Sequence, residues 1–377
     1  MFLALAALSL AAWLGLLLFR GCFWLSGPTL SAGPQTSHTV TVIVPARDEA
    51  EHITLTLRSL LAQQFPGDLR VVLIDDNSSD GTGDLARRIS AEDPRLTVVP
   101  GQPLPPGWTG KMWAVAQGLQ TPQAVAADYI LFTDADILHA PEHLSLLVAK
   151  ADAEHLALVS EMVRLRCSSL AERASIPAFV FFFQMLYPFR WVNRRSRSTA
   201  AAAGGTMLVA RRALDGIGGV DRLRSALIDD VALAREMKVA GHSIWLGHAD
   251  HAQSLRSYPH LRDVGSMIAR SAYVQLRYSP LLLLGTCTGM LALYALPVVI
   301  VFAATGPARW TAAVAWALMA IAFQPTLQRY RRNPLWGLAL PAIAMFYLAA
   351  TCASAFRFYR GRGGRWKGRA YPPKPIP

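Results

Sequence analysis

The segment Tyr129–Thr133 is short, apolar and rich in residues that favour strands, and it runs directly into Asp134 and Asp136. Such a run is typical of a strand buried in a parallel sheet. Ligands of open α/β sheets bind beyond the carboxyl ends of the strands. If the segment stays extended, both carboxylates point to one side and could bind one divalent cation. A strand followed by an acidic helix start is the alternative, and D-x-D alone does not separate the two.

Predicted strands and helices alternate along the middle of the chain. We expect strands at residues 40–45, 70–76, 95–99, 129–133, 156–165 and 242–246, and helices at residues 49–64, 83–91, 111–120, 141–152 and 231–240. This alternation predicts an α/β domain over residues 39–279, with a mostly parallel sheet flanked by helices. Neither G-x-G-x-x-G nor G-x-x-x-x-G-K-[ST] follows any of these strands, so neither a Rossmann dinucleotide site nor a P-loop is supported.

Polar loops follow three of the predicted strands, at residues 45–49, 75–82 and 133–136. Because the carboxyl ends of parallel strands meet at one edge of a sheet, we expect these loops to converge. Asp80 precedes Gly81 and is expected to be a turn residue. Asp75 and Asp76 could face a ligand, or they could equally be turn residues or helix caps.

Both ends of the chain are apolar enough to form membrane helices. The chain is 53% hydrophobic and 16% charged, whereas soluble domains are about 25% charged. Residues 1–26 contain an unbroken apolar stretch without a basic start, so we expect an uncleaved membrane helix and then a linker at residues 27–38. We expect a C-terminal membrane region of two to three spans at residues 280–356, with candidate spans at residues 281–304, 310–327 and 335–356.

The excess positive charge lies in the C-terminal third. Residues 264–377 hold 13 of the 37 Lys and Arg residues and no Asp or Glu. Basic residues beside apolar segments favour a membrane surface over nucleic acid. The positive-inside rule then predicts a multi-pass inner-membrane protein with a cytoplasmic central domain. The basic tail at residues 357–377 would fall outside, against that rule, unless the segment 335–356 is re-entrant or the segment 310–327 does not span.

An aromatic stretch at residues 176–192 is followed closely by further arginines. A core helix is possible, but aromatic residues beside arginines favour a helix that lies in the membrane interface. Further along, Gly204 and Gly205 would permit a backbone or a ligand to approach closely.

Five motifs occur in order: V-x-V-I-V-P-A-R-D-E, L-I-D-D-N-S-S-D-G-T, G-K-x-x-A, D-A-D and D-D-V-x-L-A. In this order and spacing they resemble the family 2 glycosyltransferases, and the resemblance covers residues 40 to about 278. It implies the GT-A fold and a nucleotide-activated sugar as donor. Together with the membrane segments, the stretch Gly107–Lys111 and residues 257–259 and 275–278 look closest to the hopene-associated glycosyltransferases. These resemble ceramide glucosyltransferases, whose acceptor is a membrane lipid.

The resemblance assigns donor-binding roles by motif. Residues that would line the nucleotide pocket or contact the base are Pro45, Ala46, Glu49, Asp75 and, less strongly, Asp76. Lys111 matches the lysine of the family's G-K motif, near the nucleotide. Asp134 and Asp136 match the D-x-D pair that holds the diphosphate and a divalent metal, Mg²⁺ or Mn²⁺.

The resemblance also places the general base. Asp230 matches the final aspartate of the family's T-E-D motif, which reads Ile228-Asp229-Asp230 here, so Asp229 is the alternative. Both could instead be ordinary residues of a helix start. The partial positive charge of a helix start is expected to keep Asp230 ionised at neutral pH.

One motif departs from the family pattern. Where Q-x-x-R-W is expected, the chain has Met267-Ile268-Ala269-Arg270-Ser271, and only Arg270 matches. In processive synthases this motif helps to hold the growing glycan, so its loss favours a single transfer. Arg277 is a second candidate for contacting the diphosphate.

These observations predict a membrane-bound, metal-dependent, inverting glycosyltransferase that moves a sugar to a hydroxyl of a hopanoid-like or ceramide-like lipid. One alternative is a polysaccharide or polyprenyl-phosphate glycosyltransferase. A second is a non-catalytic membrane scaffold of the same fold, although all the motif carboxylates are present. A transporter is less well supported, because the membrane segments contain no acidic residue for coupling.

Overall fold

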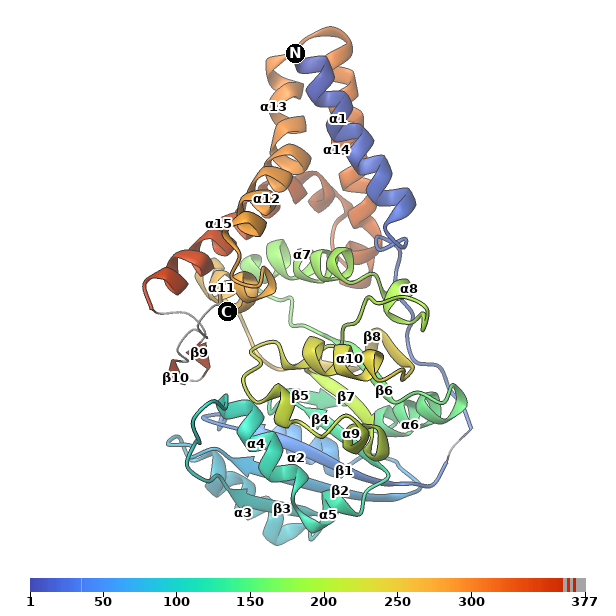
Figure 1. Ribbon diagram of the computed structural model, residues 1–377, viewed down its shortest axis with the longest axis vertical. Coiled ribbons are helices and arrows are strands. Elements are labelled where there is room, and N and C mark those ends of the chain that lie inside the picture. The colour runs from blue at the N-terminus through green and yellow to red at the C-terminus, as the bar shows by residue number, and fades with distance from the viewer. Residues whose placement is uncertain (35, 362–364, 367–368, 371–377) are drawn as a thin grey trace.

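The computed structural model describes residues 1–34, 36–361, 365–366 and 369–370. The molecule is elongated, with a sheet domain at one end and a bundle of apolar helices at the other (Figure 1). Helices α7 (Leu170–Leu186) and α11 (Leu261–Gln275) lie between these two parts. Most of the predicted basic tail lies outside the described residues.

Eight strands form the sheet, in the order β3-β2-β1-β4-β7-β6-β8-β5. They are β1 (Thr39–Ala46), β2 (Asp68–Asp75), β3 (Leu96–Pro100), β4 (Tyr129–Thr133), β5 (Ile137–His139), β6 (Leu158–Arg164), β7 (Thr206–Ala210) and β8 (Ile244–Ser254). Strand β7 runs antiparallel to both of its neighbours, and β5 runs antiparallel to β8. All other pairs are parallel. The prediction of a mostly parallel sheet flanked by helices is therefore confirmed.

Each face of the sheet has its own apolar core, because successive side chains of a buried strand point to opposite faces. In β1, Ile43 belongs to one core, whereas Val42 and Val44 belong to the other. The helices of this half of the domain are α2 (Ile53–Leu61), α3 (Thr82–Glu92), α4 (Gly110–Leu119), α5 (Pro122–Val125) and α6 (His143–Ala153). Leu57 and Leu147, from α2 and α6, pack in the Val42 core, and Met112 from α4 packs in the Ile43 core.

Strand β7 has no counterpart among the predicted strands. It inserts between β4 and β6, directly after Gly204 and Gly205. A side chain at Gly205 would lie 2.8 Å from Val163 of β6, so the expected close approach of a backbone does occur there. The chain continues through α9 (Arg211–Gly216) and a 3₁₀ turn (Asp221–Leu223) to α10 (Asp229–Val239).

Helix α7 crosses the base of the membrane bundle and contains most of the aromatic stretch, and the short helix α8 (Phe189–Val192) follows it. Ser169 and Glu172 form a capping box at the start of α7. Phe181 and Phe182 are buried, and their rings pack against Phe323 and Tyr347 of the bundle. We expected these aromatic residues to face lipid. They instead join α7 to the membrane helices, which cover its apolar side.

Among the described residues, four helical segments are long and apolar enough to cross a membrane. They are α1 (Phe2–Phe19), the segment Pro280–Ala303, α14 (Gly306–Arg329) and the segment Pro334–Tyr359. The second comprises α12 (Pro280–Met290), a π-helical turn (Leu291–Ala295) and α13 (Leu296–Ala303). The fourth comprises a 3₁₀ turn (Pro334–Ala339) and α15 (Leu340–Tyr359). A short hairpin of β9 (Arg365–Trp366) and β10 (Arg369–Ala370) follows.

The fourth segment begins and ends on the side of the sheet domain. Arg329, just before it, donates to Asp250 of β8 at 2.8 Å. The segment then runs beside α14, away from the sheet domain. Trp316 Nε1 of α14 donates to the Leu338 carbonyl of the segment at 3.1 Å. Helix α15 descends again, and the Tyr359 hydroxyl lies 2.8 Å from the Tyr273 hydroxyl of α11.

Candidate active site

Lys111 lies at the centre of a group of carboxylates beyond the carboxyl end of β4. Its Nζ is 3.0 Å from Asp134 Oδ1 and 3.1 Å from Asp229 Oδ2. Burial disfavours the charged amine, but the two carboxylates outweigh burial and raise the pKa of Lys111 above its usual range. The starts of α4 and α10 and the end of β4 therefore meet around one permanent positive charge, and they join Lys111, Asp134, Asp229 and Asp230 into what we call the Lys111 cluster.

Asp230 is held by backbone groups rather than by the lysine. Gly204 N–H donates to its Oδ2 at 2.9 Å, and Val231 N–H donates to its Oδ1 at 2.8 Å. A Cβ atom added to Gly204 would lie 3.5 Å from Asp230 Oδ2. Gly204, just before β7, therefore brings its N–H next to the Asp230 carboxylate at the start of α10.

The pKa of Asp230 is raised to about 7, first by burial and then by the negative charge of Asp229. Lys111 and the two N–H donors act in the opposite direction but do not outweigh these effects. The expectation that the helix start alone keeps Asp230 fully ionised at neutral pH is therefore wrong. The helix start supplies an N–H donor, but loss of water around the carboxylate has the larger effect.

Asp136 belongs to a second ion-paired group. Arg256, just beyond β8, donates from Nε to Asp136 Oδ2 at 2.6 Å and from Nη2 to both oxygens of Glu49 at 2.7 and 2.9 Å. Burial opposes the charge on this guanidinium, but Asp136 and Glu49 raise the pKa of Arg256. Sequence reasoning missed Arg256, because its only sequence signal is a basic residue after a strand.

Asp134 and Asp136 do not lie on an extended segment, since β4 ends at Thr133 and a turn follows. Each carboxylate therefore faces a different cation. No group of three or more His, Cys, Asp and Glu side chains is arranged to hold a metal in the part of the chain that the structure describes. Mg²⁺ is commonly bound by one or two carboxylates together with substrate phosphates. Asp134, with 40% of its side chain exposed, fits that kind of site, whereas Asp136 is 9% exposed and would have to exchange Arg256 for the metal.

The loops after β1 and β2 bind each other. Asp80 accepts hydrogen bonds from Thr82 and from Ala50 N–H, so it is a turn residue that also links the two loops. Asp75 accepts from Ser78 N–H at 3.1 Å. Asp76 is buried and contacts Arg47, and its N–H donates to the carbonyl of Ala46, which is also buried. Of these predicted donor-binding residues, Asp75 is the one that retains partial exposure.

Pro45 joins Lys111 and Asp134 in the lining of a narrow pocket that also contains Gly204 and Asp229. Its volume of about 20 Å³ suits a single water molecule, so this pocket is the innermost part of the site and not the space for a whole nucleotide.

Arg270 and Arg277 are exposed and lie at α11 and just after it. Burial raises the pKa of Tyr258, and the charges of Arg256 and Arg270 partly offset this increase. Burial likewise raises the pKa of Tyr187, whose ring lies close enough to Asp230 and Arg277 to be influenced by both charges. Tyr187 follows α7, so the carboxylate of Asp230 lies near the layer of helices that contacts the membrane bundle.

Residues 36–257 match the family described as "Glycosyltransferase like family 2", which is more than half of the chain. The protein belongs to this family. The mixed sheet, the flanking helices and the terminal apolar helices agree with the GT-A fold that the sequence motifs imply.

Several curated proteins resemble parts of this chain. The succinoglycan biosynthesis protein ExoA of Rhizobium meliloti is 37% identical over 18% of this chain and 20% of its own length. The 4,4'-diaponeurosporenoate glycosyltransferase of Staphylococcus aureus (strain bovine RF122 / ET3-1) is 34% identical over 35% of this chain and 32% of its own length. The probable glycosyltransferase YdaM of Bacillus subtilis is 26% identical over 54% of this chain and 48% of its own length. The chain thus matches less than half the length of each of these relatives.

Among solved structures, the mannosyltransferase PcManGT from Pyrobaculum calidifontis, in complex with GDP-Man and Mn²⁺, is similar with a TM-score of 0.55 and 22% identity. The similarity covers 94% of this chain and 99% of that one, so it extends beyond the sheet domain to the apolar helices. At this level of identity it establishes a shared fold.

Proposed function

We propose that the protein is a membrane-bound inverting glycosyltransferase that moves a hexose from a nucleotide-sugar donor to the hydroxyl of a hopanoid-like or ceramide-like lipid. The observation that carries this proposal is the position of Asp230. Its carboxylate lies beside the predicted diphosphate site at Asp134, and it also lies near Tyr187, beneath the helices that contact the membrane bundle. A base in that position could meet a donor from the aqueous side and an acceptor from the membrane side.

In the proposed reaction, Asp230 accepts the proton of the acceptor hydroxyl as that oxygen attacks the anomeric carbon. The bond from the anomeric carbon to the diphosphate oxygen breaks, and its electron pair leaves with the nucleoside diphosphate. General base catalysis is typically worth about 10² to 10⁴ in rate and works best when the pKa lies near the operating pH. The pKa of Asp230, at about 7, meets that condition. A single displacement inverts the anomeric configuration.

Positive charge at this site would stabilise the departing diphosphate. Lys111 supplies one fixed charge, and Asp134 and Asp136 would hold a divalent metal, Mg²⁺ or Mn²⁺. Such a metal would stabilise the negative charge that develops on the leaving group. Asp75 would contact the base, and the exposed Arg270 and Arg277 would contact the diphosphate or the acceptor head group.

We further propose that the segment 334–359 is re-entrant and that α1, the segment 280–303 and α14 span the inner membrane. Arg329 and Tyr359 both contact the sheet-domain side, which supports an entry and an exit on one side. Arg357 and Arg360 would then lie on the cytoplasmic side with the sheet domain, as the positive-inside rule requires. This arrangement removes the conflict that three full C-terminal spans would create.

The test is incubation of the purified protein, in lipid, with a panel of nucleotide sugars and Mg²⁺ or Mn²⁺, with release of nucleoside diphosphate as the readout. Product in the organic phase supports a lipid acceptor. Product in the aqueous phase would favour a polysaccharide acceptor, and one relative is named as a succinoglycan biosynthesis protein. Absence of release with every sugar would favour the non-catalytic scaffold.

A further inference from the structure

A pocket of about 430 Å³ lies between the segment that follows α1, at residues 21–28, and the region of α8. It shares no lining residue with the pocket at Lys111. Phe23, Leu25 and Phe189 give it an apolar wall, and Arg190 and Arg194 add two guanidinium groups. Both arginines are exposed, and neither forms an ion pair with an acidic side chain among the described residues.

More positive charge surrounds this pocket. The guanidinium groups of Arg20 and Arg197 lie 5.1 and 5.3 Å from the ring centre of Trp191. Arg20 directly follows α1 and donates to the Met185 carbonyl at 3.0 Å. The cations therefore lie at the level where the first apolar helix ends, which is the level of lipid head groups.

We propose that this pocket binds an anionic phospholipid, with its phosphate on Arg190 and Arg194 and the start of its acyl chains against Phe23, Leu25 and Phe189. The apolar wall and the uncompensated charges match the two parts of such a molecule. The proposal rests on the membrane placement proposed above but not on catalysis, so an inactive protein would leave it testable.

The test is native mass spectrometry of the full chain in neutral detergent with added phosphatidylglycerol or phosphatidylcholine. In the double variant R190Q/R194Q, the fraction of protein with bound phosphatidylglycerol is expected to be lower than in the wild type by a factor of about ten or more. The matched control R195Q/R331Q removes two positive charges outside the pocket. It is expected to bind phosphatidylglycerol as the wild type does. Equal loss in both variants, or no loss in either, would overturn the proposal. Displacement by inorganic phosphate at an equal concentration would show recognition of the anion alone and would also overturn it.

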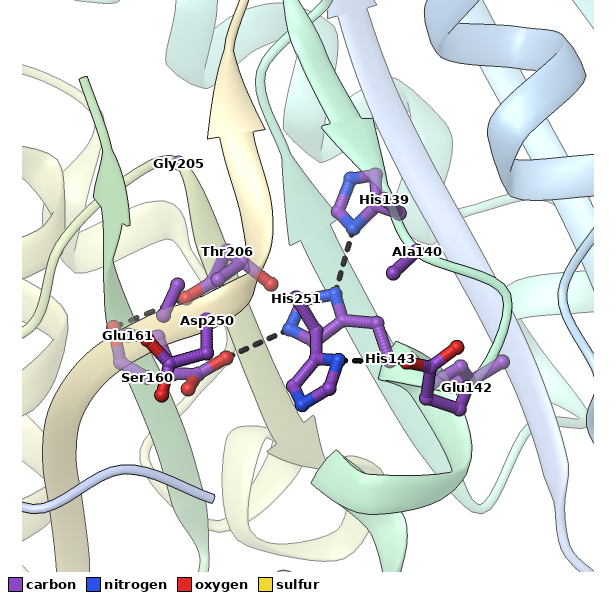
Figure 2. Close-up of polar contacts among 12 residues, drawn as sticks. His139, Ala140, Glu142, His143, Ser160, Glu161, Gly205, Thr206, Asp250 and His251 are labelled. Atoms are coloured by element: carbon purple, nitrogen blue, oxygen red, sulfur yellow. Dashed lines mark hydrogen bonds and ion pairs between the residues drawn. The ribbon is translucent and has the colours of Figure 1, made fainter. Parts of the chain in front are cut away.

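An independent inference concerns a chain of buried polar side chains that joins β6, α6 and β5 to the end of β4; Figure 2 shows its members Glu161, His143 and His139. Glu161 Oε2 lies 2.7 Å from His143 Nε2, and His143 Nδ1 lies 2.9 Å from His139 Nδ1. His139 Nε2 lies 3.0 Å from Thr133 Oγ1, which lies 2.8 Å from the Gly205 carbonyl oxygen. All four side chains are buried, and we call them the Glu161 chain.

The number of hydrogens fixes the direction of these bonds. The Gly205 carbonyl can only accept, so the single hydroxyl hydrogen of Thr133 is donated to it. His139 Nε2 must then donate to Thr133, which leaves His139 Nδ1 to accept from His143 Nδ1. A neutral His143 consequently presents a bare Nε2, and Glu161 must donate a proton to it. With an ionised Glu161 and a neutral His143, the Thr133 and Gly205 oxygens would face each other at 2.8 Å without a hydrogen between them.

The surroundings of Glu161 also favour the protonated form. Its Oε1 has no hydrogen-bond partner among the described residues, which would be costly for a carboxylate. Burial is the main effect that raises the pKa of Glu161; His251 and Arg329 oppose it, Asp250 adds to it, and together they raise the pKa to about 8. His251 is paired with Glu142, and Arg329 with Asp250. Burial lowers the pKa of His143 to about 3 and that of His139 as well, so both rings are neutral.

We infer that Glu161 carries a proton at neutral pH and that this proton orders the chain of bonds that positions Thr133, the residue before Asp134. Glu161, His143 and His139 are thus positioning residues for the proposed diphosphate site. They act through Thr133 and touch neither donor nor acceptor.

The test uses the full chain in a detergent without ester groups. E161Q keeps the shape and donates to His143 as the protonated acid does, so it is expected to fold. The infrared spectrum of E161Q is expected to lack the carbonyl stretch of a protonated carboxyl group that the wild type shows, so the difference spectrum contains a band at that position. A folded-state pKa raised above the unfolded value makes wild-type stability fall as pH rises from about 4.5 to about 8. The melting temperature of E161Q is therefore expected to exceed that of the wild type increasingly over this range.

The control is E142Q, which removes a half-exposed carboxylate that precedes His143 in the chain and pairs with His251. Its melting temperature is expected to follow the wild-type pH dependence. A difference between E161Q and the wild type that does not change with pH, or an unchanged infrared spectrum, would overturn the inference. Neither readout depends on glycosyl transfer, so failure of the proposed function would be recognised separately.

Discussion

Thr133 and Asp134 are consecutive residues, yet they belong to two polar networks that differ in charge. Asp134 belongs to the Lys111 cluster, in which a lysine faces several carboxylates and the network is partly open to water. Thr133 ends the Glu161 chain, which is fully buried and whose hydrogen bonds require neutral groups. In the open network the charges are paired, whereas in the closed network a proton removes the charge.

The difference shows how burial and partners together set protonation. A buried charge without a partner is more costly than the neutral form, so Glu161 keeps its proton. A charge with an ionised partner keeps its charge even when it is buried, as Lys111 does. Asp230 lies between these limits, since burial raises its pKa and Lys111 lowers it. A group in that intermediate position suits acid–base work near neutral pH.

The largest expected effect tests the charged network at Asp136. In excess EDTA, or in the Asp136→Asn variant, we expect no detectable turnover and loss of metal-dependent nucleotide binding, because a ligand of the proposed metal is lost. Nucleoside diphosphate release and calorimetric binding would measure this. Arg256→Gln is the control, and it is expected to keep metal-dependent binding. Full activity in EDTA would remove the metal from the mechanism.

The next effect concerns the base. Asp230→Asn keeps the shape and an acceptor oxygen for one of the two N–H groups, but it cannot take up a proton. We expect kcat to fall by at least about 10²-fold while donor affinity changes little. Steady-state kinetics with Asp229→Asn as the comparison would check this. Normal turnover in Asp230→Asn with collapse in Asp229→Asn would move the role by one residue.

A smaller effect concerns the lysine that couples the cluster. In the wild type, kcat/KM is expected to rise as pH increases through about 7, because Asp230 must lose its proton to act as a base. Lys111→Met removes the charge that lowers the pKa of Asp230, so this limb should move to higher pH by about one unit. A pH–rate profile over several buffers gives the apparent pKa of this rise independently of the maximal rate. An unmoved limb would mean that another group titrates.

The smallest effect tests the neutral network. Thr133→Val removes the hydroxyl that donates to the Gly205 carbonyl and accepts from the His139 ring. We therefore expect the free energy of unfolding to fall by about 1–3 kcal/mol. Thr133→Ser keeps the hydroxyl and should lose much less. Chemical denaturation of the two variants would compare them. Equal losses would mean that the hydrogen bonds of the hydroxyl contribute no more than packing of the methyl group, which Thr133→Ser removes.

Local patterns were sufficient for much of the fold. Apolar runs predicted β1, β2, β4 and the four apolar helices, because burial in a sheet or a membrane demands such runs. The ordered motifs predicted the family, and they also indicated Lys111 and Asp134, which the structure brings to 3.0 Å. These residues stand at strand ends and helix starts, where local sequence largely determines position.

Other features were decided by tertiary structure alone. Strand β7 is a short run after small residues, and only its insertion between β4 and β6 makes it a strand. Arg256 pairs with Glu49 across 207 residues, a contact that no local pattern specifies. The protonation of Asp230 and Glu161 depends on how much water the folded chain excludes, and the sequence does not encode that locally. The sequence therefore determined the elements and the reactive residue types, whereas the tertiary structure decided their partners and their charge.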